Sequence, residues 1–244
     1  MTPEENELTT DLKMNPEKQK RPPDPFGDDE GILDIHCRPA LPLDIPQIAF
    51  LVVDLLNKLF GPTVGDGGRE ALDVVQSALR VRLRHDCTWV MIEGDTVIGV
   101  IDVETSETRK LNGPPLPRIL SDSLGYTERV RDAGLLPLLL HEPASDEAHQ
   151  PIVSLLAGSR GEGRGTLLLM HGAFWARAQG KNWITTWLPA TDPVLQVYEH
   201  RGYFVEQEVE STGTEGSRKW LFLKRPISSL SYKIMRQKEK EKSL

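Results

Sequence analysis

The segment SRGEGRGT, residues 159–166, constrains the fold most, because it places three glycines between two apolar segments of different type. PIVSLLAG before it is typical of a buried strand, and LLLMHGAFWARAQG after it is typical of an amphipathic helix. The first N–H groups of a helix have no acceptor within the helix, and glycines let an anion approach the backbone closely. A strand, a glycine-rich turn and a helix in this order therefore favour a phosphate site.

Two arginines flank these glycines. Arg160 and Arg164 can contact phosphate oxygens, although Arg164 could equally point to solvent. A P-loop would need Gly-Lys-Ser/Thr, and a dinucleotide fingerprint would need Gly-x-Gly-x-x-Gly early in a βαβ unit; neither is present. The pattern that is present is Arg-x-x-Gly-x-Gly, with Arg160, Gly163 and Gly165. A glycine-rich turn without any ligand is the alternative.

Composition excludes several classes of protein. The chain has 244 residues, 39% of them hydrophobic, which suits one well-buried domain, and its net charge of −7 argues against nucleic acid as a partner. Cys37 and Cys87 are too few for a disulfide framework, so we expect buried free thiols in a reducing compartment. No run approaches the about 20 apolar residues of a membrane span. We expect a cytoplasmic protein with no membrane partner.

Apolar periodicity divides the chain into a domain with two tails. We expect a flexible tail over 1–30, one domain over 31–227 with a variable segment at 105–150, and a charged tail over 228–244. Strands and helices alternate through the domain, which predicts an α/β (α+β) three-layer sandwich whose mixed central sheet of about seven strands carries helices on both faces. Expected strands cover 31–40, the two arms of a hairpin around Gly94-Asp95 within 87–104, 151–158, 182–190, 203–211 and 218–226. Expected helices cover 42–60, 69–84, 118–133, 164–179 and 192–202, and 141–150 is expected to be a polar loop.

With its surroundings, the arginine–glycine pattern resembles the GNAT superfamily of acetyl-CoA-dependent N-acetyltransferases. Val153-x-Leu155 lies where that family has a strand that holds pantetheine, and VYEHRGYF supplies the tyrosine, glycine and aromatic of a later helix and strand. The resemblance covers roughly residues 32–225. The chain departs from the family at Ala157, where proline is frequent, and at Thr191, where asparagine is common.

The resemblance implies acetyl-CoA as co-substrate and no metal. The loop would hold the pyrophosphate and the preceding strand the pantetheine arm, while Tyr198 would protonate the departing thiolate. A Tyr198 that only packs in the core is the alternative. The cofactor-binding residues implied are Val153, Leu155, Leu156, Ala157, Arg160, Gly161, Glu162, Gly163, Arg164, Gly165, Thr166, Thr191 and Tyr198.

The sequence does not single out one residue as the general base. Glu104 is the first candidate, near the end of an expected strand, and a chain of waters could replace a dedicated base. His141-Glu142 lacks the second histidine of a His-Glu-x-x-His metal site. The other candidate bases are Glu93, His141, Glu142 and His149.

The expected activity is transfer of the acetyl group to a primary amine by direct attack in a ternary complex. The amine acceptor, small molecule or protein, would be bound by the first two helices, the 105–150 segment and the closing hairpin, in a monomer or homodimer. The acidic balance favours a cationic acceptor. One alternative is a non-catalytic module that binds or senses acyl-CoA, and another is a scaffolding role through the tails.

Overall fold

The computed structural model describes residues 35–60, 68–83, 86–112, 118, 141–159, 163–213 and 216–228. All of them belong to the unit Asp34–Leu244. The predicted tail 1–30, the predicted helix 118–133 apart from Arg118, and the tail beyond Ser228 lie outside the described residues. None of the described helices is long and apolar enough to cross a membrane.

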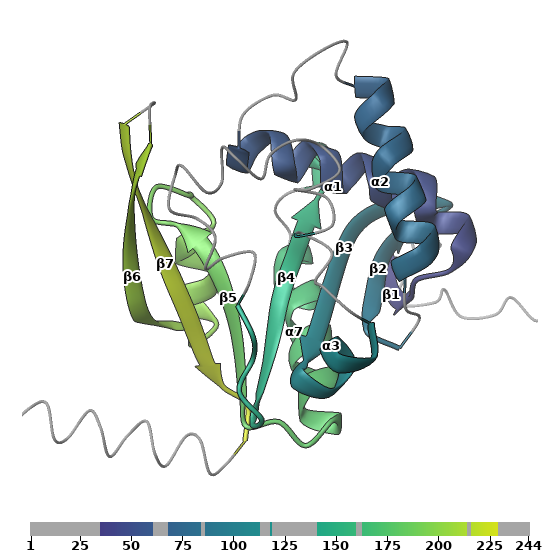
Figure 1. Cartoon of the computed structure of the whole chain (residues 1–244). Coiled ribbons are helices and arrows are strands. Elements are labelled where there is room, and N and C mark those ends of the chain that lie inside the picture. Colours follow the sequence, from purple (N-terminus) through teal and green to yellow (C-terminus); the bar gives the residue numbers. More distant parts are fainter. Residues whose placement is uncertain are drawn as a thin grey trace, which may run out of the picture. The chain divides into compact units, whose positions relative to one another are not determined.

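Seven strands form one mixed sheet, which confirms the expected mixed sheet of about seven strands, and their order is β1-β2-β3-β4-β5-β7-β6 (Figure 1). Every neighbouring pair is antiparallel except β4 and β5, which run parallel. The strands are β1 (Ile35–Pro39), β2 (Thr88–Glu93), β3 (Thr96–Thr105), β4 (Glu147–Leu155), β5 (Trp183–Pro189), β6 (Phe204–Gly213) and β7 (Gly216–Pro226).

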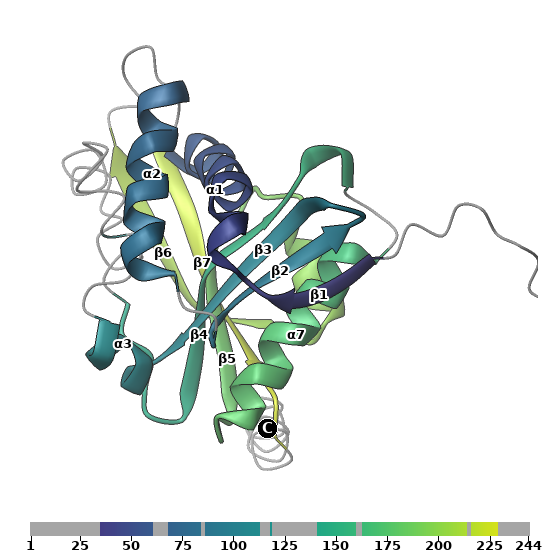
Figure 2. The ribbon, with the colours of Figure 1, turned by 90° about the vertical axis from the view of Figure 1, so that its right-hand side faces the viewer.

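Helices cover both faces of the sheet (Figure 2). Because side chains alternate along a strand, Val90 and Ile92 of β2 pack with α1 and α2, whereas Met91 packs with α7 on the opposite face. Tyr198 of α8 belongs to the same cluster as α7. The helices are the 3-10 turn η1 (Pro42–Asp44), α1 (Ile45–Phe60), α2 (Gly68–Arg82), α3 (Ser106–Asn112), the 3-10 turn η2 (Ala157–Ser159), α7 (Arg164–Ala178) and α8 (Leu195–His200).

Strands β4 and β5 separate after a short paired stretch. Only residues 147–149 of β4 pair with 183–185 of β5. Beyond that point β4 continues against β3 as far as Leu155, while β5 stays paired with β7 as far as Pro189. Figure 1 shows the two strands close together at their start and apart at their ends. Beyond His149 no described strand pairs with the edge of β4 that faces β5, although the Thr186 hydroxyl of β5 still donates a 3.0 Å hydrogen bond to the Gln150 carbonyl.

The predicted loop 141–150 is wrong in its second half, because β4 begins at Glu147. The three polar residues at the start of β4, Glu147, His149 and Gln150, are buried by partners that are distant in the sequence. Lys224 of β7 pairs with Glu147, Thr185 of β5 contacts His149, and Tyr203 donates to the Gln150 amide oxygen. His149 thus lies within the strand and not before it.

The length of α8 and the burial of one cysteine also differ from what the sequence predicts. Helix α8 is shorter than the predicted 192–202, since Asp192 caps a turn by accepting a 2.9 Å hydrogen bond from the Val194 N–H. Of the two free cysteines, Cys87 is buried as predicted and Cys37 is only half-buried. Burial raises the pKa of the Cys37 thiol to about 11.

Candidate functional site

The glycine-rich loop leads directly into the first turn of α7. Gly163 is the N-cap residue with a φ of 75°, in the left-handed region, and no side chain caps the helix there. The first helical hydrogen bond runs from the Leu167 N–H to the Gly163 carbonyl at 3.0 Å, so the N–H groups of 164–166 have no acceptor within the helix. Arg160, Gly161 and Glu162 lie outside the described residues.

The start of α7 packs against the end of β4. A Cβ on Gly165 would lie 3.2 Å from the Leu155 side chain, and a Cβ on Gly99 of β3 would lie 2.7 Å from the same leucine. Leu155 therefore fills the space left by two glycines. This contact holds the first turn of α7 beside the unpaired part of β4.

Arg164 does not point freely to solvent. Its guanidinium donates a 2.6 Å hydrogen bond to the Glu93 carboxylate at the end of β2, and both side chains are less than one-fifth exposed. The ion pair ties the first residue of α7 to a strand on the other side of β3. It also places a carboxylate beside the predicted phosphate site.

The end of β4 contains one main-chain donor that is already used. The Leu156 N–H donates to the Ile98 carbonyl at 2.8 Å, so it is not available to a carbonyl oxygen of a ligand. Ala157 begins the short turn η2 that leads into the loop. Val153 and Leu155 remain on the strand whose other edge is open.

Tyr198 is buried in α8, with 4% of its surface exposed. Its ring packs edge-on against Tyr203, with centroids 5.0 Å apart, and its hydroxyl has no hydrogen-bond partner among the described residues. Burial raises the pKa of this phenol, which keeps it protonated. Thr191 is exposed in the turn before α8.

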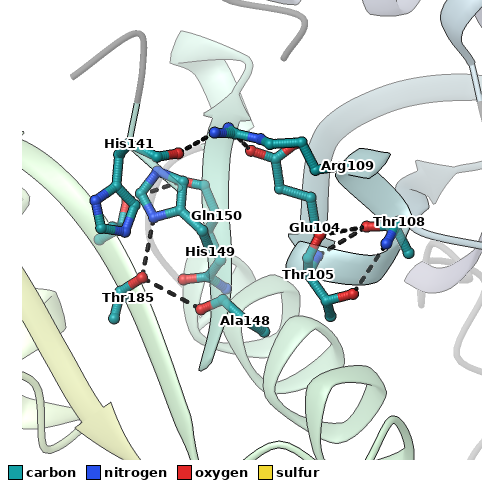
Figure 3. A network of polar contacts seen from close by, with 10 residues as sticks. Glu104, Thr105, Thr108, Arg109, His141, Ala148, His149, Gln150 and Thr185 are labelled. Atoms are coloured by element: carbon teal, nitrogen blue, oxygen red, sulfur yellow. Dashed lines mark hydrogen bonds and ion pairs between the residues drawn. The ribbon is translucent and has the colours of Figure 1, made fainter. Parts of the chain in front are cut away.

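Glu104 is buried at the end of β3 and forms an ion pair with Arg109 of α3 (Figure 3). Arg109 also donates to the His141 carbonyl, which joins α3 to the segment before β4. The negative charge of Glu104 is thereby compensated inside the fold. Nothing in the sequence pattern around Arg109 predicts this partner.

His149 lies directly across from Glu104 in the β3–β4 register. Its Nδ1 is 3.0 Å from the Thr185 hydroxyl, and its ring lies alongside His141 with centroids 4.5 Å apart (Figure 3). Burial lowers the pKa of His149 well below its ordinary value, helped by the nearby His141 and Arg109. The imidazole is therefore neutral at neutral pH.

Solved structures that resemble this chain include acetyltransferases. An acetyltransferase is 21% identical over 79% of this chain and 100% of its own, with a TM-score of 0.57. The candidate acetyltransferase yncA from Salmonella typhimurium, solved with its cofactor acetyl-CoA, is 14% identical over 80% of this chain and 95% of its own, with a TM-score of 0.53. A candidate acetyltransferase of the GNAT family from Desulfovibrio desulfuricans is 13% identical over 80% and 99%, with a TM-score of 0.51.

The chain has the GNAT fold. This confirms the fold that the resemblance implied. No protein-family model matches the sequence, and neither does the sequence of any curated protein.

The GNAT fold brings the predicted site residues to three places. Gly163, Arg164 and Gly165 lie at the start of α7 beside Leu155, whereas Tyr198 lies in α8. Glu104 and His149 lie on β3 and β4. Within the described ranges, no group of three or more histidine, cysteine or carboxylate side chains could hold a metal ion.

Sequence reasoning missed the partners of these residues. Arg109, Thr185 and Gln150 were not singled out, although all three contact the predicted region. Their residue types carry no signal on their own, since threonine and glutamine are common in strands and turns alike. Only the pairing of β4 with β3 and β5 brings them together.

Proposed function

We propose that this protein is an N-acetyltransferase that transfers the acetyl group of acetyl-CoA to a primary amine. The observation that carries the proposal is the path from the open edge of β4 through the glycine-rich loop to the uncapped first turn of α7. A helix N-terminus, whose first N–H groups have no acceptor within the helix, suits a diphosphate. An open strand edge suits the amide groups of the pantetheine arm, which can pair with it as a short strand would.

The cofactor would occupy this path from loop to strand. The main-chain N–H groups of 164–166, together with Arg160, Gly161 and Glu162 of the loop, would hold the diphosphate. Arg164 would add charge once its pairing with Glu93 is shared with a phosphate. Val153 and the neighbouring residues of β4 would pair with pantetheine, and Thr191 would contact the cofactor from the turn before α8.

Tyr198 would act as the acid for the departing thiolate. Its hydroxyl is protonated and has no competing partner among the described residues, which leaves it able to donate to sulfur. The amine would attack the thioester carbonyl directly, because a covalent intermediate would need an activated nucleophile. The half-buried thiol of Cys37 has a raised pKa and is not such a nucleophile.

A non-catalytic module that binds acyl-CoA is the second candidate. The burial of Tyr198 and the pairing of Glu104 with Arg109 favour it, because both side chains are held as structural groups are. The two candidates differ in turnover and agree on acetyl-CoA binding. The acceptor, small molecule or protein, and a monomeric or homodimeric state remain predictions.

The test is release of free CoA thiol from acetyl-CoA in the presence of n-butylamine, spermidine or an N-terminally free peptide. We expect wild-type protein to release thiol with at least one amine. The variant Tyr198→Phe should lose about 10- to 1,000-fold of that rate while its acetyl-CoA affinity changes little. Binding of acetyl-CoA without thiol release from any amine would favour the binding module instead.

A further inference from the structure

We propose that Nε2 of His149 takes the proton of the amine acceptor and that the Thr185 hydroxyl fixes the tautomer that leaves this nitrogen free. The inference rests on the proposed acetyl transfer and names the base for it. It assigns a catalytic role to His149 and a positioning role to Thr185.

His149 lies at the point where β4 and β5 part. His149 and Thr185 are the last residues of the β4–β5 pairing, and the open edge of β4 begins just beyond Gln150, whose carbonyl accepts from the Thr186 hydroxyl. Ala148 belongs to the cluster under α7, so the His149 side chain is directed to the opposite face of the sheet, the face that α1 and α2 cover. A thioester held along the open edge of β4 would thus lie next to this imidazole.

The hydrogen bonds around Thr185 determine which ring nitrogen is protonated. The Thr185 hydroxyl donates its single proton to the Ala148 carbonyl at 3.3 Å. While the hydroxyl donates to Ala148, the same oxygen can only accept toward His149, 3.0 Å away, and this assigns the proton of the ring to Nδ1. A neutral imidazole protonated at Nδ1 has its lone pair at Nε2. That nitrogen can accept a proton.

The charged groups around the imidazole are already compensated in pairs. Glu104 pairs with Arg109, and Glu147 pairs with Lys224, whose ammonium lies 2.6 Å from the carboxylate. His141, the remaining titratable neighbour, has a pKa that burial lowers. Protonating Glu104 would break its ion pair with Arg109, whereas protonating His149 breaks none. The histidine is therefore the better proton acceptor of the two.

The proton count closes for one turnover. A primary ammonium gives one proton to Nε2 of His149, which passes it to solvent, and the neutral amine nitrogen attacks the thioester carbon. The C–N bond forms, and the C–S bond breaks with its electron pair going to sulfur. Sulfur takes a proton from Tyr198, whose phenolate recovers the second amine proton through solvent. The products are an amide, the CoA thiol and one proton released.

The experiment measures kcat/KM for n-butylamine between pH 5 and pH 9 in wild type, His149→Gln and the control His171→Gln. His171 is a half-buried histidine on α7 against Trp89, whereas His149 is buried. We expect His149→Gln to lower kcat/KM at pH 7 by about 100- to 10,000-fold. Its rate should then rise about tenfold per pH unit toward the amine pKa of about 10, because only the free amine reacts without a base. Wild type and His171→Gln should be nearly flat from pH 7 to pH 9.

A second pair of variants tests Thr185 without touching the histidine. Thr185→Val removes the oxygen that accepts from Nδ1 and should lower kcat/KM about tenfold, whereas Thr185→Ser should restore it. Nitrogen NMR of ¹⁵N-histidine-labelled protein should show a single Nδ1–H tautomer for His149 in wild type and a mixture in Thr185→Val. Acetyl-CoA affinity, measured for each variant, reports whether the fold is intact.

Three results would overturn the proposal, in different ways. Equal rates and equal pH dependence in wild type and His149→Gln would remove His149 from the mechanism and leave the acetyl transfer standing. An Nε2–H tautomer in wild type would do the same. Wild-type protein that binds acetyl-CoA and never releases thiol with n-butylamine would remove the proposed function and the base together.

Discussion

At the scale of single residues, the ion pair between Arg164 and Glu93 decides how charge is distributed at the start of α7. The carboxylate and the guanidinium are both mostly buried, so their interaction is screened less than that of an exposed pair. Glu93 stands as a negative charge near the place where a diphosphate would bind. Sequence reasoning placed Arg164 at the loop correctly, but its partner lies 71 residues away in the chain.

Glu93→Gln should therefore strengthen acetyl-CoA binding. Removing the carboxylate frees Arg164 for phosphate and removes a repulsion, which we expect to lower Kd about 3-fold, a typical effect of one partly exposed charge. Glu208→Gln is the matched control, because Glu208 pairs with Lys219 on the exposed hairpin β6–β7. Calorimetric titration measures the Kd for acetyl-CoA of wild type, Glu93→Gln and Glu208→Gln. Weaker binding by Glu93→Gln would show that the pair supports the loop instead of competing with the ligand.

At the scale of elements, amphipathic patterning predicted α1, α2 and α7, and two apolar runs around Gly94-Asp95 predicted the β2–β3 hairpin. It failed at the start of β4, where EAHQ carries no large apolar side chain. Those side chains are buried by hydrogen bonds and ion pairs with β5, β7 and Tyr203. Partners 36 to 77 residues apart leave no local pattern, so a single sequence cannot show them.

The contact between α7 and the sheet predicts a stability change at Gly172. A Cβ there would lie 2.6 Å from the Gln150 amide nitrogen and 2.7 Å from the Ile101 side chain. Overpacking of about 1–3 kcal/mol exceeds the gain of about 1 kcal/mol in helix propensity, so Gly172→Ala should lower the free energy of unfolding in urea. Gly172→Val should lower it further.

Gly158→Ala is the control for this substitution, because nothing lies within 4 Å of a Cβ at that position. Its free energy of unfolding should stay within about 0.5 kcal/mol of wild type. A Gly172→Ala protein as stable as wild type would mean that α7 does not lie as close to β3 and β4 as described.

At the scale of the whole domain, the sheet order and the parting of β4 from β5 join the separate features into one site. The alternation of strands and helices predicted the sandwich, and the resemblance added the role of the open strand edge. The pairing of His149 with Thr185 depends on a parallel contact between strands that only the folded sheet creates. Residue types alone made His149 one candidate among several.

The central claim is that the loop before α7 binds acetyl-CoA, and calorimetric titration of glycine variants tests it most directly. Gly163→Asp and Gly180→Asp add the same charge at left-handed glycines with φ of 75° and 74°, one at the start of α7 and the other just beyond its end. A Cβ at either glycine would meet nothing within 4 Å. We predict that wild type and Gly180→Asp bind acetyl-CoA and that Gly163→Asp does not. Equal binding by Gly163→Asp and Gly180→Asp, or none by wild type, would contradict the account.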